Sequence, residues 1–128
     1  PLLLAVTVLT SISQDAFNNE IGLSGTIEQQ VTKWAALAKQ AGIDGVVCSP
    51  WEISAIRHAC GENLLIVTPG VRPAWAAKGD QERIMTPKEA IARGASYLVV
   101  GRPITAHTNP VEAVKMIVAE MEEGAKAL

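Results

Sequence analysis

The sequence predicts an α/β fold in which parallel strands alternate with helices, and three observations lead to this prediction. The strand-like runs, such as residues 45–48 (GVVC) and 98–100 (LVV), are continuously apolar. Such runs are typical of parallel strands buried on both faces, because half-exposed antiparallel strands alternate apolar and polar residues. A helix-start signal follows each run, and glycines end most of the predicted helices. The chain of 128 residues is 48% hydrophobic, which is enough apolar material for a core.

The first half of the chain predicts two strands and one long helix. Residues 1–9 form an apolar run, and the polar stretch after it indicates a turn or a short helix. The helix over residues 26–42 begins at a capping-box pattern, because Thr26 is followed three residues later by Gln29, and it ends at a glycine. The apolar run 43–48 is the next predicted strand.

Three further helices begin with the same signals. Each has a capping side chain, a proline at the next position and a glutamate three residues after the cap, at Ser49-Pro50 with Glu52, Thr86-Pro87 with Glu89 and Asn109-Pro110 with Glu112. The first two of these helices are expected to end near Gly61 and Gly94. The apolar runs 64–68 and 97–101, which follow them, are the third and fourth predicted strands.

The composition indicates one globular unit and excludes several classes of partner. A net charge of −2 and a pI near 5.7 do not indicate the basic surface that nucleic-acid binding requires, and no basic run indicates binding to a membrane surface. The first apolar run is too short to span a bilayer and lacks the basic region of a signal peptide. We therefore expect a cytoplasmic protein with a small-molecule partner. Cys48 and Cys60 are expected to be buried thiols, so no metal site is predicted.

Four strand–helix units fit either an open doubly wound sheet or a closed barrel of eight strands. The open sheet is disfavoured because no Gly-x-Gly-x-x-Gly follows the first strand and no suitably placed acidic residue ends the second. A barrel of the TIM type, (β/α)8, needs eight units and about 250 residues. We therefore predict that residues 1–128 form a single partial domain, one half of such a barrel.

Two arginines follow strand-like runs and predict an anion site. Arg72 comes after the third run and Arg102 after the fourth, each with a glycine close before it, Gly70 and Gly101. A guanidinium offers a fixed fork of donors that matches a phosphate dianion, and the loop after the last barrel strand is a frequent phosphate site in this fold. The segment between the third strand and the third helix has no convincing helix pattern, so we interpret it as a mobile lid; a surface loop is the alternative.

Other polar residues are expected to have structural roles. His58 and His107 have no neighbouring carboxylate or serine partner, so surface or capping positions are expected for both. Glu120 and its neighbours in the last helix are expected to lie on a solvated face. The sequence has no lysine at the end of a strand-like run, so it offers no evident proton donor for catalysis.

Five motifs, in this order and spacing, resemble the bacterial form of orotidine 5′-monophosphate decarboxylase. They are AVTVLTS (residues 5–11), DGVVCS (44–49), VTPGVRP (67–73), GDQ (79–81) with Arg83 and Thr86-Pro87, and VVGRPIT (99–105). The resemblance covers essentially the whole chain and corresponds to the C-terminal half of the family's barrel. It implies conversion of orotidine 5′-monophosphate to uridine 5′-monophosphate and CO2, in de novo pyrimidine biosynthesis.

The resemblance also implies roles for individual residues. Thr10 would contact the pyrimidine ring, while Arg72, Gln81, Gly101 and Arg102 would hold the phosphate end of the nucleotide. Catalysis would need no cofactor and would use a Lys and Asp cluster in the N-terminal half of the barrel, so no catalytic residue is named in this chain. A homodimer of complete barrels is implied as well.

Two alternatives remain open at this stage. One is a related sugar-phosphate barrel of the hexulose phosphate synthase type, which the Leu-Thr-Ser and Asp-Gln pairs disfavour. The other is a non-catalytic phosphate-binding half-barrel that pairs with a second copy of itself to complete eight strands.

Overall fold

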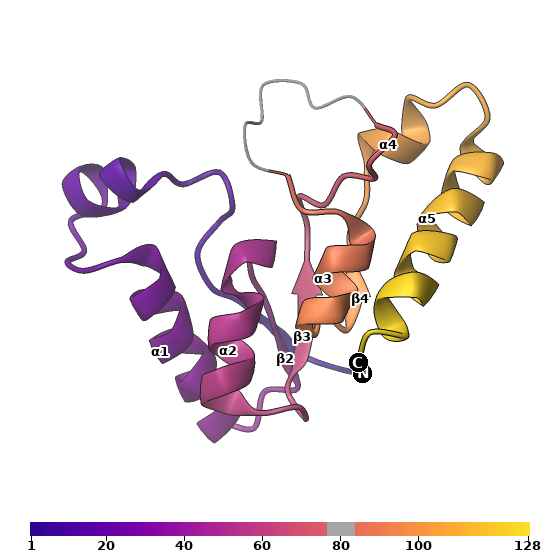
Figure 1. The fold of residues 1–128 in the computed structure, drawn as a ribbon. Coiled ribbons are helices and arrows are strands. Elements are labelled where there is room, and N and C mark those ends of the chain that lie inside the picture. Colours follow the sequence, from indigo (N-terminus) through magenta and orange to yellow (C-terminus); the bar gives the residue numbers. More distant parts are fainter. Residues whose placement is uncertain (77–83) are drawn as a thin grey trace.

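The computed structural model describes residues 1–76 and 84–128, and its centre is a four-stranded sheet (Figure 1). All neighbouring strands pair in parallel and in chain order. The strands are β1 (Leu4–Val6), β2 (Gly45–Val47), β3 (Leu65–Thr68) and β4 (Tyr97–Leu98). The predicted fold class, four parallel strands alternating with helices, is confirmed.

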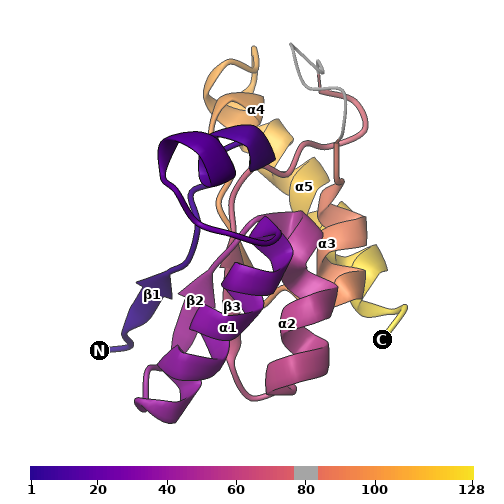
Figure 2. The ribbon, with the colours of Figure 1, turned by 90° about the vertical axis from the view of Figure 1, so that its left-hand side faces the viewer.

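The helices follow the strands along the chain. They are the π-helical turn η1 (Ala16–Glu20), α1 (Ile27–Gln40), the 3-10 turn η2 (Pro50–Glu52), α2 (Ile53–Cys60), α3 (Pro87–Arg93), α4 (Arg102–Thr105) and α5 (Pro110–Ala125). Figure 2 shows α1 and α2 side by side in front of the sheet. In the described part of the chain, no helix combines the length and the apolar character that crossing a bilayer requires.

The core lies between the helices and one face of the sheet. Val46 of β2 and Ile66 of β3 are register partners, and both are fully buried under the helices. Side chains one residue away point to the opposite face, as strand geometry requires. On that face, four large apolar side chains remain 43% to 60% exposed: Leu4, Val6, Tyr97 and Val99. The sheet therefore has one covered face and one open apolar face.

Local capping signals account for the helix starts. Thr26 forms a reciprocal capping box with Gln29, and Thr86 does the same with Glu89, as predicted. Asn109 accepts the N–H of Glu112 at the start of α5. Ser49 caps a 3-10 turn by accepting the N–H of Trp51, and α2 proper begins only at residue 53.

Two regions differ from the expected secondary structure. Residues 97–101 were expected to be extended, but β4 ends at Leu98 and the chain enters α4 at Arg102. A helix of four residues is too short to show a periodic apolar pattern, so it left no signal in the sequence. The observed strands are also shorter than the apolar runs, because ladder pairing covers only part of each run.

Arg57 ties together the amino-terminal ends of two strands. Its guanidinium donates to the carbonyl oxygens of Gly61, Leu64 and Gly94 and to the hydroxyl of Ser96. The Ser96 hydroxyl in turn accepts the N–H of Ile66 (3.0 Å), within β3. The Arg57 side chain is only 10% exposed. One side chain thus joins the end of α2, the start of β3 and the loop from α3 to β4.

Both cysteines are buried and unpaired, as predicted. Burial, together with the nearby charge of Glu52, raises the pKa of the Cys48 thiol to about 12. Glu52 itself is 7% exposed. Burial raises the pKa of its carboxyl, and the negative charge of Glu28 adds to this, while a hydrogen bond from Ser49 acts in the opposite direction. The folded state therefore disfavours the ionised form of both groups.

We expect Arg57→Met to lower the free energy of unfolding by about 2–4 kcal/mol, because several half-buried carbonyl oxygens lose their donor at once. Urea denaturation of the folded protein measures this. Arg93→Met is the matched control. Arg93 is exposed and lies 5.4 Å from the centre of the Trp51 ring, so its loss should cost about 1 kcal/mol or less. Equal losses in the two variants would contradict the role assigned to Arg57.

We expect Glu52→Gln to stabilise the protein more at neutral pH than at pH 4. Below the ordinary pKa of 4.5, the carboxyl is protonated in both the folded and unfolded states, so the raised folded pKa has no effect. As the pH rises, the unfolded state ionises first, and ionisation then disfavours folding. Thermal unfolding of the wild-type protein and of Glu52→Gln between pH 4 and neutral pH tests whether the stability difference grows with pH. A melting-temperature difference that shrinks with rising pH would contradict it.

Candidate functional site

The carboxyl ends of the four parallel strands lie at one edge of the sheet, which we call the rim. It consists of the loops that follow β1 to β4, and it lies at the upper end of the molecule in Figure 1. Thr10 follows β1, Ser49 follows β2, Arg72 follows β3, and Arg102 follows β4. Parallel pairing thus brings together residues that are up to 92 positions apart in the sequence.

The loop after β3 is anchored at both ends. Val71 forms a parallel bridge with Met85, and the backbone N–H of Arg72 donates to the carbonyl oxygen of Met85 (3.0 Å). Both bridge residues are buried. Gly70 just before them has a φ of 77°, a left-handed conformation that favours glycine. The bridge holds the backbone at Arg72 in place, and the Arg72 side chain is half-buried.

Thr10 and the loop after β3 meet at Gly70. A Cβ built on this glycine would lie 3.6 Å from the Thr10 methyl carbon, so the two loops are in van der Waals reach. Below them, the buried hydroxyl of Thr68 donates to the carbonyl oxygen of Cys48 (2.7 Å). This bond fixes the carboxyl ends of β2 and β3 relative to each other. The predicted pyrimidine contact therefore lies beside the first of the two arginine loops.

The loop after β4 turns directly into α4. Gly101 is the residue before the helix, and its carbonyl oxygen accepts the N–H groups of Ile104 and Thr105. A Cβ built on Gly101 would meet no atom of the described residues within 4 Å. Arg102, the first residue of α4, is exposed. This part of the rim is open to solvent and to a ligand.

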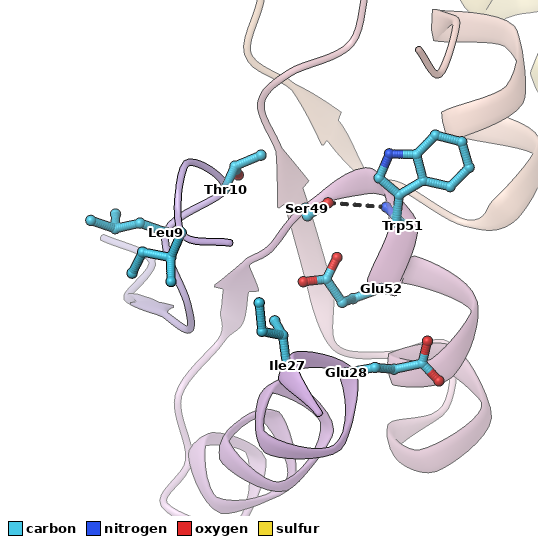
Figure 3. A pocket seen from close by; sticks show the side chains of 8 residues that line it. Leu9, Thr10, Ile27, Glu28, Ser49, Trp51 and Glu52 are labelled. Carbon is cyan, nitrogen blue, oxygen red and sulfur yellow. Dashed lines mark hydrogen bonds between the residues drawn. The ribbon is translucent and has the colours of Figure 1, made fainter. Parts of the chain in front are cut away.

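A pocket of about 290 Å³ opens beside Thr10 (Figure 3). Its lining comes from the loop after β1, the start of α1 and the turn after β2, and consists of Leu9, Thr10, Ile12, Ile27, Glu28, Ser49, Trp51 and Glu52. The carboxyl of Glu52 points into it. Two carboxyl groups and no basic side chain line this pocket, so it does not suit a phosphate group. The arginines lie on the loops after β3 and β4 instead.

The structure places four of the five predicted site residues at the rim: Thr10, Arg72, Gly101 and Arg102. Gln81 lies outside the described residues, as do all of residues 77–83 of the segment interpreted as a lid. In the described part, the lysines at positions 33, 39, 88 and 115 lie on helices, and Lys126 directly follows α5. None of these stands at the end of a strand, as the sequence indicated. The described residues also contain no group of three or more His, Cys, Asp or Glu side chains that could hold a metal ion.

Sequence reasoning missed two contacts near the rim. The expectation that Glu120 lies on a solvated face was wrong, because its Oε1 accepts the N–H of Ala74 (3.4 Å) and its Oε2 is buried. Trp75 also packs against His107, with ring centroids 5.3 Å apart. Both contacts join segments more than 30 residues apart, and no local pattern in the sequence signals them. A surface or capping position was expected for His107; its ring is half-buried, and its Nδ1 accepts the N–H of Asn109 (2.9 Å), the residue that caps α5.

Comparisons with known proteins agree with this geometry. The model of the "Orotidine 5'-phosphate decarboxylase / HUMPS family" matches residues 1–117. The orotidine 5'-phosphate decarboxylase of Moorella thermoacetica is 58% identical over 122 residues, which are 95% of this chain and 48% of that protein. The enzyme of the same name from Heliobacterium modesticaldum is 59% identical over 97% of this chain and 51% of its own length. The chain therefore spans about half the length of these relatives.

Solved structures give the same result. The crystal structure of orotidine 5'-phosphate decarboxylase from Lactobacillus acidophilus matches with a TM-score of 0.80 and 44% identity, over 94% of this chain and 49% of that one. The enzyme from Pyrococcus horikoshii OT3 matches with a TM-score of 0.68 and 26% identity, again over about half of its chain. The four strand–helix units thus correspond to half of a TIM-type barrel, and the chain belongs to the orotidine 5'-phosphate decarboxylase / HUMPS family.

Proposed function

We propose that this chain is the substrate-binding half of an orotidine 5′-monophosphate decarboxylase, which forms uridine 5′-monophosphate and CO2 in cytoplasmic pyrimidine biosynthesis. The observation that carries the proposal is the meeting of Thr10, Arg72 and Arg102 at one rim. Identity above 50% to proteins named as this enzyme supports it. The sugar-phosphate synthase alternative has no comparable support from these relatives.

The phosphate end of the nucleotide is assigned to the loops after β3 and β4. The planar fork of a guanidinium pairs with two oxygens of a tetrahedral phosphate, and two guanidinium groups match the charge of the dianion. The open space at Gly101 allows an anion to approach the backbone closely. We assign a further contact to Gln81, on the segment that joins the two ends of the Val71–Met85 bridge.

The pyrimidine end is assigned to Thr10. Its side chain lies against Gly70, just before the loop of Arg72, so one nucleotide can reach both residues. A threonine hydroxyl both donates and accepts a hydrogen bond, which suits the carbonyl and N–H groups along a pyrimidine edge. We infer that phosphate binding on one side of the rim orients the ring on the other side.

The chemical step needs groups that the described residues do not supply. Loss of CO2 leaves a carbanion on the ring, which must receive a proton from a positioned acid. No described lysine stands at the rim. We propose that a Lys and Asp cluster on the other four strand–helix units of the barrel supplies this proton, without a cofactor. Those units would also cover the open face of the sheet, and two complete barrels would form the homodimer.

A chimera tests the function directly. The N-terminal half of the Moorella thermoacetica relative, which this chain does not match, is fused ahead of residues 1–128. We expect this chimera to decarboxylate orotidine 5′-monophosphate. A folded chimera that turns over a hexulose phosphate instead would support the synthase alternative. A folded chimera that binds nucleotide without turnover would support the non-catalytic alternative.

In the same chimera, Arg102→Ala should lower kcat/KM for the nucleotide by about 10- to 100-fold. This range corresponds to the loss of a charged hydrogen-bonding group, worth about 1.5–3 kcal/mol. Turnover of orotidine, which lacks the phosphate, should not change. Arg93→Ala removes an exposed arginine on α3 and serves as the control. Equal effects of Arg102→Ala on nucleotide and nucleoside would contradict the phosphate assignment.

A further inference from the structure

Two aromatic rings connect the loop after β3 with the loop that leads into α5. The Trp75 and His107 rings meet edge to face, with centroids 5.3 Å apart and an angle of 85° between their planes. This is a favourable arrangement for an aromatic pair, because the positive edge of one ring faces the negative face of the other. Trp75 lies three residues after Arg72, and His107 lies five residues after Arg102.

The Trp75 side of the contact is fixed to the body of the protein. The backbone N–H of Arg72 donates to Met85, in a bridge whose residues are buried. A turn follows, in which the N–H of Ala76 donates to the carbonyl oxygen of Pro73 (3.0 Å). Within this turn, the N–H of Ala74 donates to Glu120 on α5 (3.4 Å). A displacement of the Trp75 ring would therefore act on the backbone that carries Arg72.

The His107 side is fixed to α4 and α5. The N–H of His107 donates to the carbonyl oxygen of Ile104 (3.2 Å), and the next residue back, Ala106, donates to that of Arg102 (2.9 Å). The ring nitrogen Nδ1 accepts the N–H of Asn109 (2.9 Å), the residue that caps α5. In the neutral ring the proton is then on Nε2. The orientation of the ring is thus coupled to the short helix that begins with Arg102.

We propose that Trp75 and His107 are positioning residues, which hold the two arginine-bearing loops at the separation that one phosphate group requires. This inference rests on the phosphate site proposed above. A phosphate bound by two loops from different strands gains affinity if the loops are already spaced for it, because less ordering remains to be done on binding. Neither ring needs to touch the phosphate, so their effect should depend on the pair and not on either ring alone.

A double-mutant cycle in the chimera tests the inference. Trp75→Ala, His107→Ala and the double variant are compared for kcat/KM with the nucleotide and with orotidine. We expect each single substitution to lower kcat/KM for the nucleotide about twofold to tenfold, the range that corresponds to one aromatic pair. The effect should appear mainly in KM, and turnover of orotidine should not change. The double variant should be no worse than the poorer single variant.

Conservative variants separate positioning from loss of folding. Trp75→Phe keeps a ring at the contact and should recover most of the nucleotide affinity. His107→Phe keeps the ring but loses the acceptor for Asn109, so it should recover less. His58→Ala removes an exposed histidine on α2, outside both arginine-bearing loops, and should leave all parameters unchanged.

The outcomes distinguish this inference from the proposed function. Independent, additive losses in the double variant would overturn the coupling while leaving the phosphate site intact. If the chimera binds uridine 5′-monophosphate but does not turn over substrate, the same double-mutant cycle is measured by calorimetry as affinities for uridine 5′-monophosphate. Non-additive losses of affinity would then support the coupling, and additive losses would overturn it. A folded chimera that binds no uridine 5′-monophosphate would overturn the phosphate site and the coupling together.

Discussion

Parallel pairing of the four strands in chain order is the constraint on which the rest of the structure depends. Because all strands point the same way, every loop that follows a strand lies at one edge of the sheet and every loop that precedes one lies at the other. The first edge carries Thr10, Arg72 and Arg102, while the second carries the Arg57 hydrogen bonds. The Arg57 contacts and the proposed binding residues are thereby separated by the length of a strand.

This separation explains why the surroundings of Arg57 and Arg102 differ so much. The Arg57 side chain is only 10% exposed, and its guanidinium donates to carbonyl and hydroxyl oxygens of the protein. Arg102 is exposed at the first turn of a short helix, beside a glycine with open space around it. A guanidinium has five N–H donors, so one whose donors bind backbone oxygens has none left to bind an anion. Chemical type alone therefore does not identify a binding arginine, whereas its place relative to the strand does.

The sequence predicted those features that depend on a few neighbouring residues. The boxes at Thr26 and Thr86 are local patterns of side chain and backbone, and both formed as predicted. The continuous apolar runs were enough to predict parallel strands, because burial on both faces leaves no polar position. The arrangement of Arg72 and Arg102 followed from their places after strands, without any knowledge of side-chain contacts.

The contacts that sequence reasoning missed depend on distant segments. Glu120 accepts a hydrogen bond from Ala74, and the Trp75 ring packs against His107. Neither partner can be identified before the loops are placed in space. The same holds for α4, whose four residues carry too little pattern to be distinguished from an extended end of β4.

In the proposed decarboxylase, the open face of the sheet would link stability to catalysis. Leu4, Val6, Tyr97 and Val99 expose apolar surface that further strands of a barrel would cover, and each Å² so removed from water contributes about 25 cal/mol. In our proposal the proton donor comes from the same four strand–helix units that cover this face. Closure of the sheet into a barrel would then exclude water from the interior and position the acid at the same time. In this proposal the contacts of Arg72 and Arg102 with the phosphate need no such closure, since hydrogen bonds within this half of the barrel hold the backbone at both residues. The proposal therefore divides binding and proton transfer between the two halves of the barrel, and only proton transfer depends on joining them.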